Sequence, residues 1–303
     1  MSYKFEKNES IGQAVERVAL EQLNEVAKHT EAKTGLDEAV HDARVGFKKI
    51  RGLIRLVRTE LGNNNYKREN IFYRDLNRRL SDIRDAAAMT EILDKLQEHY
   101  EGELSRDVFE SFRRSFATAK RKRQADKIKV LADVRREIVA ARMRVKTWEI
   151  KNDDFSAVGK GLSRSYARGR TAYGQAYDQR STESFHEWRK QVKYLRYQIR
   201  LLANVWPRQM EKFSDQLKKL VAHLSDEHDL AILRKRILKE PVQGGHEHQT
   251  LVALIDKRRA ELQAKASFLG ERIYAEKPKA FIQRFHAYWR AWRSEQTLIR
   301  SFE

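Results

Sequence analysis

The sequence predicts an all-α protein built from two similar halves. Apolar residues recur three and four positions apart through most of the 303 residues, which is the spacing of amphipathic helices, and strand-like alternation of useful length is absent. The chain has only three prolines, so long helices meet few breaks. A basic helical motif also returns 145 positions after its first occurrence. We therefore expect two antiparallel four-helix-type bundles related by pseudo-twofold symmetry around a basic central cleft or pore.

Helix-start and helix-stop residues divide the first half of the chain. One helix is expected to open after Ser10 and to end at Gly35, and a second is expected to begin at Asp37. The Gly-Asn-Asn-Asn run at 62–65 separates the second helix from a third, which extends toward Asp85. Apolar spacing resumes over 89–96, and further helical patterns cover 103–122 and 126–148.

The second half follows a similar order. Its helices are expected over 156–176, from Thr182 to the stop at Trp206-Pro207, over 246–274 and over 277–293. A segment that ends in Asp229 parallels the one that ends in Asp85, at an offset of 144. The polar run 151–154 lies near the middle of the chain. We therefore predict one domain, residues 1–303, with halves of about 1–150 and 151–303.

The helix predicted from Asp37 carries a row of basic residues. They are spaced 3, 4, 3 and 4 positions apart, which places them in one line on one face. An apolar line with the same spacing lies about 100° away around the helix, so one face can enter a core while its neighbour holds cations at the rim. We call the basic line row 1: His41, Arg44, Lys48, Arg51 and Arg55. The apolar line is Phe47, Ile50, Ile54, Val57 and Leu61.

The same row returns in the second half with every residue type unchanged. We call it row 2: His186, Arg189, Lys193, Arg196 and Arg200. Its apolar line is Trp188, Val192, Leu195, Ile199 and Leu202. Thr182 stands four residues before His186, as Asp37 does before His41, and both are expected N-caps. If these basic residues only formed a solvated surface, nothing would require the same spacing in both halves. The repeat therefore favours a functional site. Tyr194 and Tyr197 either line that site or pack in the core.

Composition limits the classes of function. A net charge of +19 and a pI near 10 favour a polyanionic partner, which could be nucleic acid, an anionic membrane or polyphosphate. The absence of cysteine excludes disulfides and thiolate metal sites. The first residues hold no apolar signal-peptide core, and no window approaches 18 apolar residues. We therefore expect a soluble cytoplasmic protein without a membrane partner.

Two rows that face one cleft would place ten basic groups around it. Like charges at helical spacing already oppose helix stability, and two facing rows would repel more strongly. A bound polyanion relieves that repulsion. The histidines are expected in the first turn of their helices, where free N–H groups and the helix dipole also favour an anion.

A metal-dependent helical phosphohydrolase is one alternative. His41, His186, His228, Asp85 and Asp229 are possible metal ligands. However, cations one or two turns from the first two histidines would repel a divalent ion, and the chain has no HExxH pair, Gly-rich phosphate loop or nucleophile elbow. We therefore predict no catalytic residue, no metal site and no cofactor. The two aspartates are better explained as structural residues that either bond a helix N-terminus or pair with an arginine of a basic helix.

A general nucleic-acid-binding polycation is the other alternative. Basic stretches at 113–123 and 135–146 make salt-dependent binding to DNA or RNA expected. Specific recognition needs base-reading groups or stacking aromatics on the basic face, and the rows contain neither. A bare phosphate chain fits the rows better, so nucleic acid is expected to bind only non-specifically.

The two motifs, taken together and in this order, resemble those of the CHAD family, the conserved histidine α-helical domain. The first copy reads H-x-x-R-V-x-x-K-x-x-R over 41–51, and the second reads H-x-x-R-K-x-x-K-x-x-R-Y over 186–197. The segments that end in Asp85 and Asp229 also match, and the resemblance extends over nearly the whole chain, from Phe5 to the Pro278 helix. Val45 and Lys190 differ between the copies, so the two rows need not contribute equally.

This resemblance implies a pair of four-helix bundles with a basic central channel that binds inorganic polyphosphate, and a binding and targeting role rather than catalysis. Some members of the family carry a triphosphate-tunnel hydrolase domain ahead of this one. Because no room for it exists before residue 9, we expect a stand-alone member without hydrolase activity.

We therefore predict non-catalytic binding of inorganic polyphosphate through rows 1 and 2, with targeting to polyphosphate granules as a further expectation. The arginines and lysines would neutralise phosphate charge, and arginine can grip two oxygens at once. The histidines would donate hydrogen bonds and strengthen binding as the pH falls through their titration range. We make no prediction of the oligomeric state.

Overall fold

The computed structural model describes the backbone of residues 3–32, 34–81, 85–102, 109–110, 112–114, 124–239 and 245–300, and the side chains of all of these except 85–88, 124–126, 245–247 and 296–300. Within these ranges every regular element is a helix, which confirms the predicted all-α class. No helix in the same ranges is long and apolar enough to cross a lipid bilayer.

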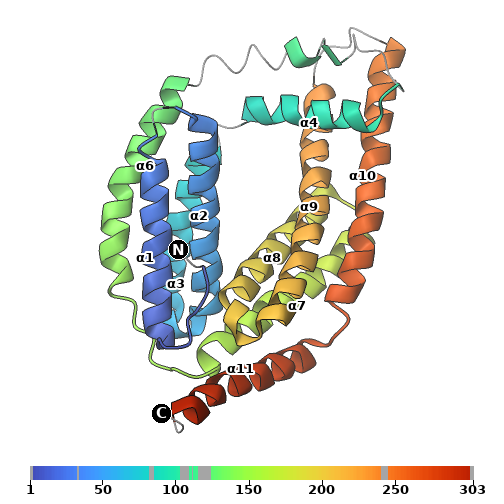
Figure 1. Cartoon of the computed structure of the whole chain (residues 1–303). Coiled ribbons are helices and arrows are strands. Elements are labelled where there is room, and N and C mark those ends of the chain that lie inside the picture. Colours follow the sequence, from blue (N-terminus) through green and yellow to red (C-terminus); the bar gives the residue numbers. More distant parts are fainter. Residues whose placement is uncertain are drawn as a thin grey trace.

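Helices from the first part of the chain form one group. Figure 1 shows them side by side: α1 (Ile11–His29), α2 (Leu36–Leu56), α3 (Arg58–Ser81) and α6 (Gln124–Val145). A second group contains α7 (Ser156–Gln179), α8 (Thr182–Leu201), α9 (Pro207–Ile237) and α10 (Gly245–Ile273).

Two further helices lie at opposite ends of these groups. α4 (Asp85–His99) crosses at one end from the first group to α9, and α11 (Pro278–Arg300) runs across the other end against α7 (Figure 1). A short 3-10 helix, η2 (Ala203–Val205), joins α8 to α9. α2 and α8 are in direct contact with each other, so the helices that carry rows 1 and 2 meet between the two groups.

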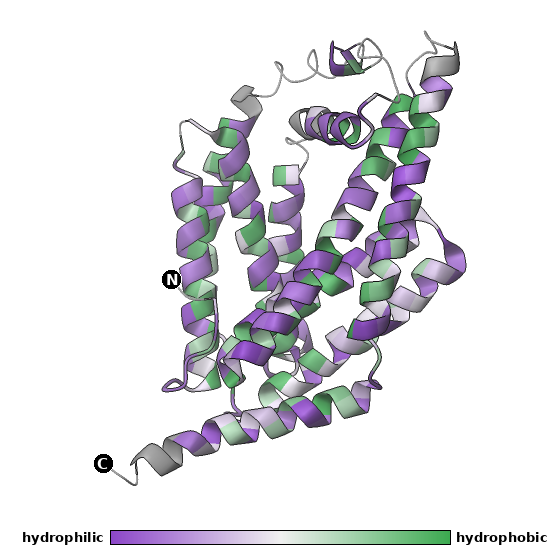
Figure 2. Cartoon of the chain, turned by 45° about the vertical axis from the view of Figure 1, so that its right-hand side comes forward, coloured by the Kyte–Doolittle hydropathy of each residue, from purple (hydrophilic) through white to green (hydrophobic). Residues whose placement is uncertain are grey.

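Both predicted apolar lines are buried. None of their ten side chains is more than 4% exposed, which confirms the predicted orientation of α2 and α8. Figure 2 shows apolar and polar residues alternating along the helices, as amphipathic helices require. Burial of each large apolar side chain contributes about 1.5–3 kcal/mol. Because the basic rows are fixed on the neighbouring faces, this burial holds them at the edge of the core.

Two glycines permit close contacts between the groups. A Cβ atom on Gly52 in α2 would lie only 2.7 Å from the Cβ atom of Tyr197 in α8. A Cβ atom on Gly161 in α7 would lie only 1.9 Å from the carbonyl oxygen of Leu56 in α2. Both distances are too short for real carbon atoms, so these crossings need residues without a side chain.

Both predicted N-caps of the basic helices were wrong. Gly35, in the left-handed conformation, precedes α2, and Asp37 lies inside the first turn, where it forms an ion pair of 2.7 Å with Lys127 in α6. Ser181 caps α8 by accepting a hydrogen bond from the backbone N–H of Ser184. The helices therefore begin one turn before the histidines, and neither histidine lies in the first turn.

The other predicted boundaries agree better with the structure. α1 begins after Ser10, whose side chain forms a capping box with Gln13. The break expected at 62–65 is a kink at Gly62 inside α3, where φ is 72°. Residues 146–155, between α6 and α7, form no helix. Most of the helix predicted over 103–122 lies outside the described residues.

Candidate functional site

Rows 1 and 2 lie on neighbouring helices. α2 and α8 approach each other near their C-terminal ends, where Gln198 Nε2 lies 3.5 Å from the backbone oxygen of Gly52. Toward their N-terminal ends the two helices diverge (Figure 1). The basic residues that precede Gly52 in row 1 and Tyr197 in row 2 therefore lie where the two helices move apart from each other.

Lys193 marks the place where the two rows influence each other. Burial, followed by the charges of Arg189, Lys48 and Arg44, lowers the pKa of its ammonium group to about 7, while the charge of Asp229 opposes this change. Two of these cations belong to row 1 and one to row 2. The structure thus brings members of both rows within electrostatic range of one amine.

Row 1 continues toward the crossing through two arginines that stack on row 2's helix. The guanidinium of Arg55 lies 4.1 Å from the ring centroid of Tyr194, and that of Arg51 lies 5.6 Å from it. Arg55 also donates to Tyr66 Oη at 2.9 Å, and both arginines donate to Asn70 Oδ1 at 3.2 Å. These partners are uncharged, so they orient the guanidinium groups without neutralising them. Tyr194 therefore contacts two arginines of row 1.

The C-terminal end of row 2 meets the N-terminal segment of the chain. The guanidinium of Arg200 lies 5.5 Å from the ring of Tyr3, whose hydroxyl donates to the carbonyl of Lys49 at 2.7 Å. Tyr197 packs edge-on against the same ring at 6.3 Å, so it is a packing residue. Burial and the charge of Arg200 lower the pKa of Arg196.

The two row histidines occupy different environments. His41 is exposed, whereas His186 is half-buried and its Nδ1 lies 3.3 Å from both His228 Nδ1 in α9 and Arg189 Nη2. Burial, followed by the charge of Arg189, lowers the pKa of His186 and brings that of His228 to about 3. Both imidazoles of this pair are therefore neutral near pH 7 in the free protein. His228 had been considered from sequence only as a metal ligand.

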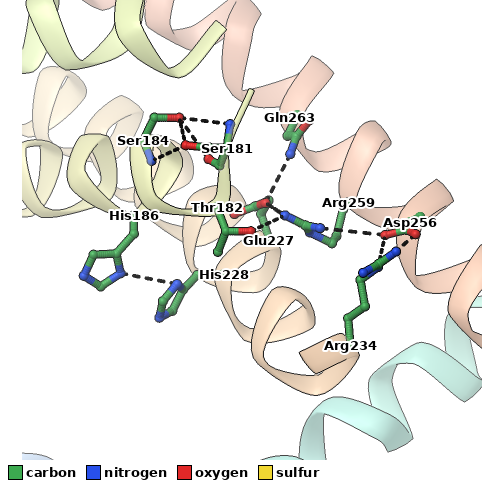
Figure 3. Close-up of polar contacts among 10 residues, drawn as sticks. All are labelled: Ser181, Thr182, Ser184, His186, Glu227, His228, Arg234, Asp256, Arg259 and Gln263. Atoms are coloured by element: carbon green, nitrogen blue, oxygen red, sulfur yellow. Dashed lines mark hydrogen bonds and ion pairs between the residues drawn. The ribbon is translucent and has the colours of Figure 1, made fainter. Parts of the chain in front are cut away.

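A buried ionic network secures the beginning of α8 (Figure 3). Glu227 in α9 is 1% exposed and accepts from Arg259 in α10 at 2.8 Å, and Arg259 also donates to Thr182 Oγ1 at 3.1 Å. Gln263 donates to the same carboxylate at 3.1 Å. Because removal of one partner from a buried pair is strongly destabilising, this network holds row 2 firmly against α9 and α10. Sequence reasoning missed it, because neither Arg259 nor Gln263 belongs to a repeated motif.

The structure describes the side chain of only one of the two aspartates discussed with the motifs, Asp229 and Asp85. Asp229 lies close enough to Arg189 and Lys193 to favour their charged forms, in agreement with the predicted role as a partner of basic residues. The Asp85 side chain lies outside the described residues. Among the described side chains, no group of three or more His, Asp or Glu residues could hold a metal ion.

Several arginines of the rows keep an unsatisfied donor. The Nε–H groups of Arg55, Arg189 and Arg196 are buried and have no hydrogen-bond partner among the described residues. Such a group costs about 1–3 kcal/mol. Together with the lowered pKa of Lys193, these groups indicate that the free protein packs its cations at an energetic cost.

Comparison with protein families gives one match. A family model described as "CHAD domain" matches residues 17–238, a span that contains both basic rows and the helices α2 and α8. No curated protein matches the chain.

Proposed function

Because the chain belongs to the CHAD domain family, we propose that it binds inorganic polyphosphate, without catalysis, in a basic channel between rows 1 and 2. The observation that carries this proposal is that Arg189, Lys48 and Arg44 all lie within electrostatic range of Lys193. Four cations held together oppose each other unless a polyanion neutralises them. Recruitment to polyphosphate granules in the cytoplasm would follow from such binding and belongs to the same proposal.

The proposal includes a pseudo-twofold axis that passes between α2 and α8. Gly52 and Tyr197 are 145 positions apart, the offset of the repeat, and they are in contact. Lys48 and Lys193 have the same offset and lie within electrostatic range. An axis that relates the two helices would bring equivalent positions together in this way.

Contacts on either side of the crossing support the same axis. Arg55 stacks on Tyr194, and the equivalent pair is Arg200 and Lys49. Arg200 is close enough to lower the pKa of Lys49, although burial is the larger cause. In this second pair the ring that faces the arginine is that of Tyr3, because position 49 is not aromatic. The two ends of the proposed channel therefore differ chemically.

A competition titration at physiological salt tests the proposed function. Labelled long-chain polyphosphate is expected to bind tightly, matched-charge duplex DNA is expected to compete poorly, and EDTA is expected to have no effect. A duplex carries its phosphates on the outside of a wide core of stacked bases and cannot enter a narrow channel, whereas a bare phosphate chain can follow the rows. Equal competition by DNA would favour the general polycation. Release of phosphate from polyphosphate or a nucleotide on addition of Mg²⁺ or Mn²⁺ would favour the phosphohydrolase.

Affinity for polyphosphate is expected to rise as the pH falls through about 7. In the free protein the pKa of Lys193 is about 7, so the amine is mostly neutral at pH 8.5 and mostly charged at pH 6. A phosphate chain binds the charged form better, so protonation and binding reinforce each other, and we expect about a tenfold gain over this range. The sequence assigned this effect to the histidines, but the lowered pKa of His186 moves its titration to more acidic pH.

Lys193→Arg provides the control for that pH dependence. Arginine keeps its charge over the whole range, so the variant is expected to bind with a much flatter pH profile, with an affinity close to that of the wild type at pH 6 and above it at pH 8.5. Titration of the terminal phosphates of the ligand is common to both proteins and cancels in the comparison. Isothermal titration calorimetry at several pH values measures the difference. Parallel profiles for the two proteins would remove Lys193 as the source.

A further inference from the structure

A recess lies at the C-terminal end of row 1, where α2, α3, α7 and α8 meet. Its cavity volume is only about 10 Å³, which is room for about one water molecule, so a ligand would contact the recess from its open side. No carboxylate is among the described residues that line it. Its polar lining side chains are chiefly Arg55, Arg58, Tyr66, Arg164, Arg168 and Gln191. We call the three arginines outside row 1 the arginine recess: Arg58, Arg164 and Arg168.

The arginine recess holds its charges close together without neutralising them. Arg58 lies 4.5 Å from the ring of Tyr66 and donates to Asn63 Oδ1 at 3.3 Å. Arg164 is half-buried, and its Nη1 has no hydrogen-bond partner among the described residues. Burial lowers the pKa of Arg164, and the neighbouring charges of Arg58 and Arg168 lower it further. A guanidinium group in such surroundings gains from an anion that supplies oxygen acceptors.

The recess is continuous with row 1. Arg55 lines it, and the Arg55 guanidinium donates to Tyr66 Oη while Arg58 lies over the face of the same ring. The contact of Gly161 with the α2 backbone places α7 here, and Arg164 and Arg168 follow that glycine by three and seven residues, on the same face of α7. The geometry therefore leads from Arg55 directly to the arginines of α7.

The internal repeat does not account for this cluster. At the offset of 145, the positions equivalent to the three arginines are Ala203, Ala19 and Leu23. The end of row 2 instead meets the Tyr3 ring. The recess is thus found at only one end of the proposed channel.

We propose that the arginine recess is a phosphate subsite that continues row 1, so that a long phosphate chain leaves the rows along α7. This inference rests on the proposed function and adds a direction to it. A chain short enough to stay within the rows would not reach the subsite, whereas a long chain would contact all three arginines.

The test measures the binding of long-chain polyphosphate and of tripolyphosphate to three proteins. The first is the wild type, and the second is the recess variant Arg58→Gln/Arg164→Gln/Arg168→Gln. The third is the charge-matched control Arg208→Gln/Lys218→Gln/Arg272→Gln, whose positions are exposed and lie outside the recess. Three lost contacts are expected to weaken long-chain polyphosphate binding about 50-fold at ~0.15 M salt and to reduce the slope of log K against log salt by about 2. Tripolyphosphate affinity is expected to stay unchanged. The control should keep near wild-type affinity for both ligands.

Each other result contradicts the inference in a distinguishable way. If the recess variant loses no more long-chain affinity than the control, the recess contacts no ligand. An equal loss of tripolyphosphate affinity would mean that the arginines act through the fold or the rows. A thermal shift with inorganic phosphate that disappears in the recess variant, while long-chain affinity is retained, would identify a site for free phosphate. If wild type binds neither ligand, the proposed function fails as well.

Discussion

Replacement of Arg44, Lys48, Arg189 and Lys193 by alanine is expected to abolish most of the specific binding of polyphosphate. Each phosphate contact with a flexible chain contributes a slope of about 0.7 to the dependence of log K on log salt, so four lost contacts correspond to a roughly 200-fold weaker affinity at ~0.15 M salt. Two of these residues come from each row and converge near Lys193. The loss should therefore exceed that of any four cations scattered over the surface.

The variant is also expected to fold at least as well as the wild type. Burial and neighbouring positive charges disfavour the charged form of Lys193, and burial disfavours the charged form of Arg189. Replacing both residues by alanine therefore removes two sources of instability from the free protein. Fluorescence-detected binding and thermal denaturation measure the two effects separately. The matched control removes four exposed cations elsewhere: Arg208, Lys218, Arg272 and Lys279.

Two results would argue against the rows as the binding site. Equal affinity of the row variant and the wild type would leave the repeat with a purely structural role. An equal loss in the charge-matched control would mean that binding depends on net charge alone, and the protein would then be a diffuse polycation.

Gly161→Ala is expected to cause the largest loss of stability of any single substitution proposed. The new Cβ atom would lie 1.9 Å from the carbonyl oxygen of Leu56, and backbone atoms cannot yield as the end of a flexible side chain can. Separating α7 from α2 costs packing along the whole contact, so we expect a loss of about 3 kcal/mol or more. The Tm should fall by at least about 6 °C.

Gly174→Ala in the same helix is the matched control. No heavy atom lies within 4 Å of the Cβ position at Gly174, and the change from glycine to alanine favours the helix by about 0.5–1 kcal/mol. The control should therefore be as stable as the wild type or slightly more so. Chemical denaturation of both variants measures the difference. If Gly161→Ala is as stable as Gly174→Ala, the close approach of α7 to α2 is not required for the fold.

Residues that act within one helix were predictable from the sequence. Spacing of three and four positions decides which side chains share a face, so row 1, row 2 and their apolar lines followed directly from the order of residues. The residues at which the helices begin were harder to predict from the sequence. Asp37 and Ser181 are both good capping residues by type, but Asp37 pairs with Lys127 from a distant helix, and a glycine precedes α2 instead.

Contacts between helices distant in the sequence were decided only by the tertiary structure. Tyr194 stacks on Arg55, His228 faces His186, and the arginine recess forms because Gly161 lets α7 touch α2. Spacing along one helix contains no information about which residue of another helix lies opposite. The sequence by itself therefore determined the fold class, the family resemblance and the two basic rows. Packing decided how close those rows come, which neutral groups orient them and where Lys193 acquires a lowered pKa, because burial and neighbouring charge exist only once the helices are assembled.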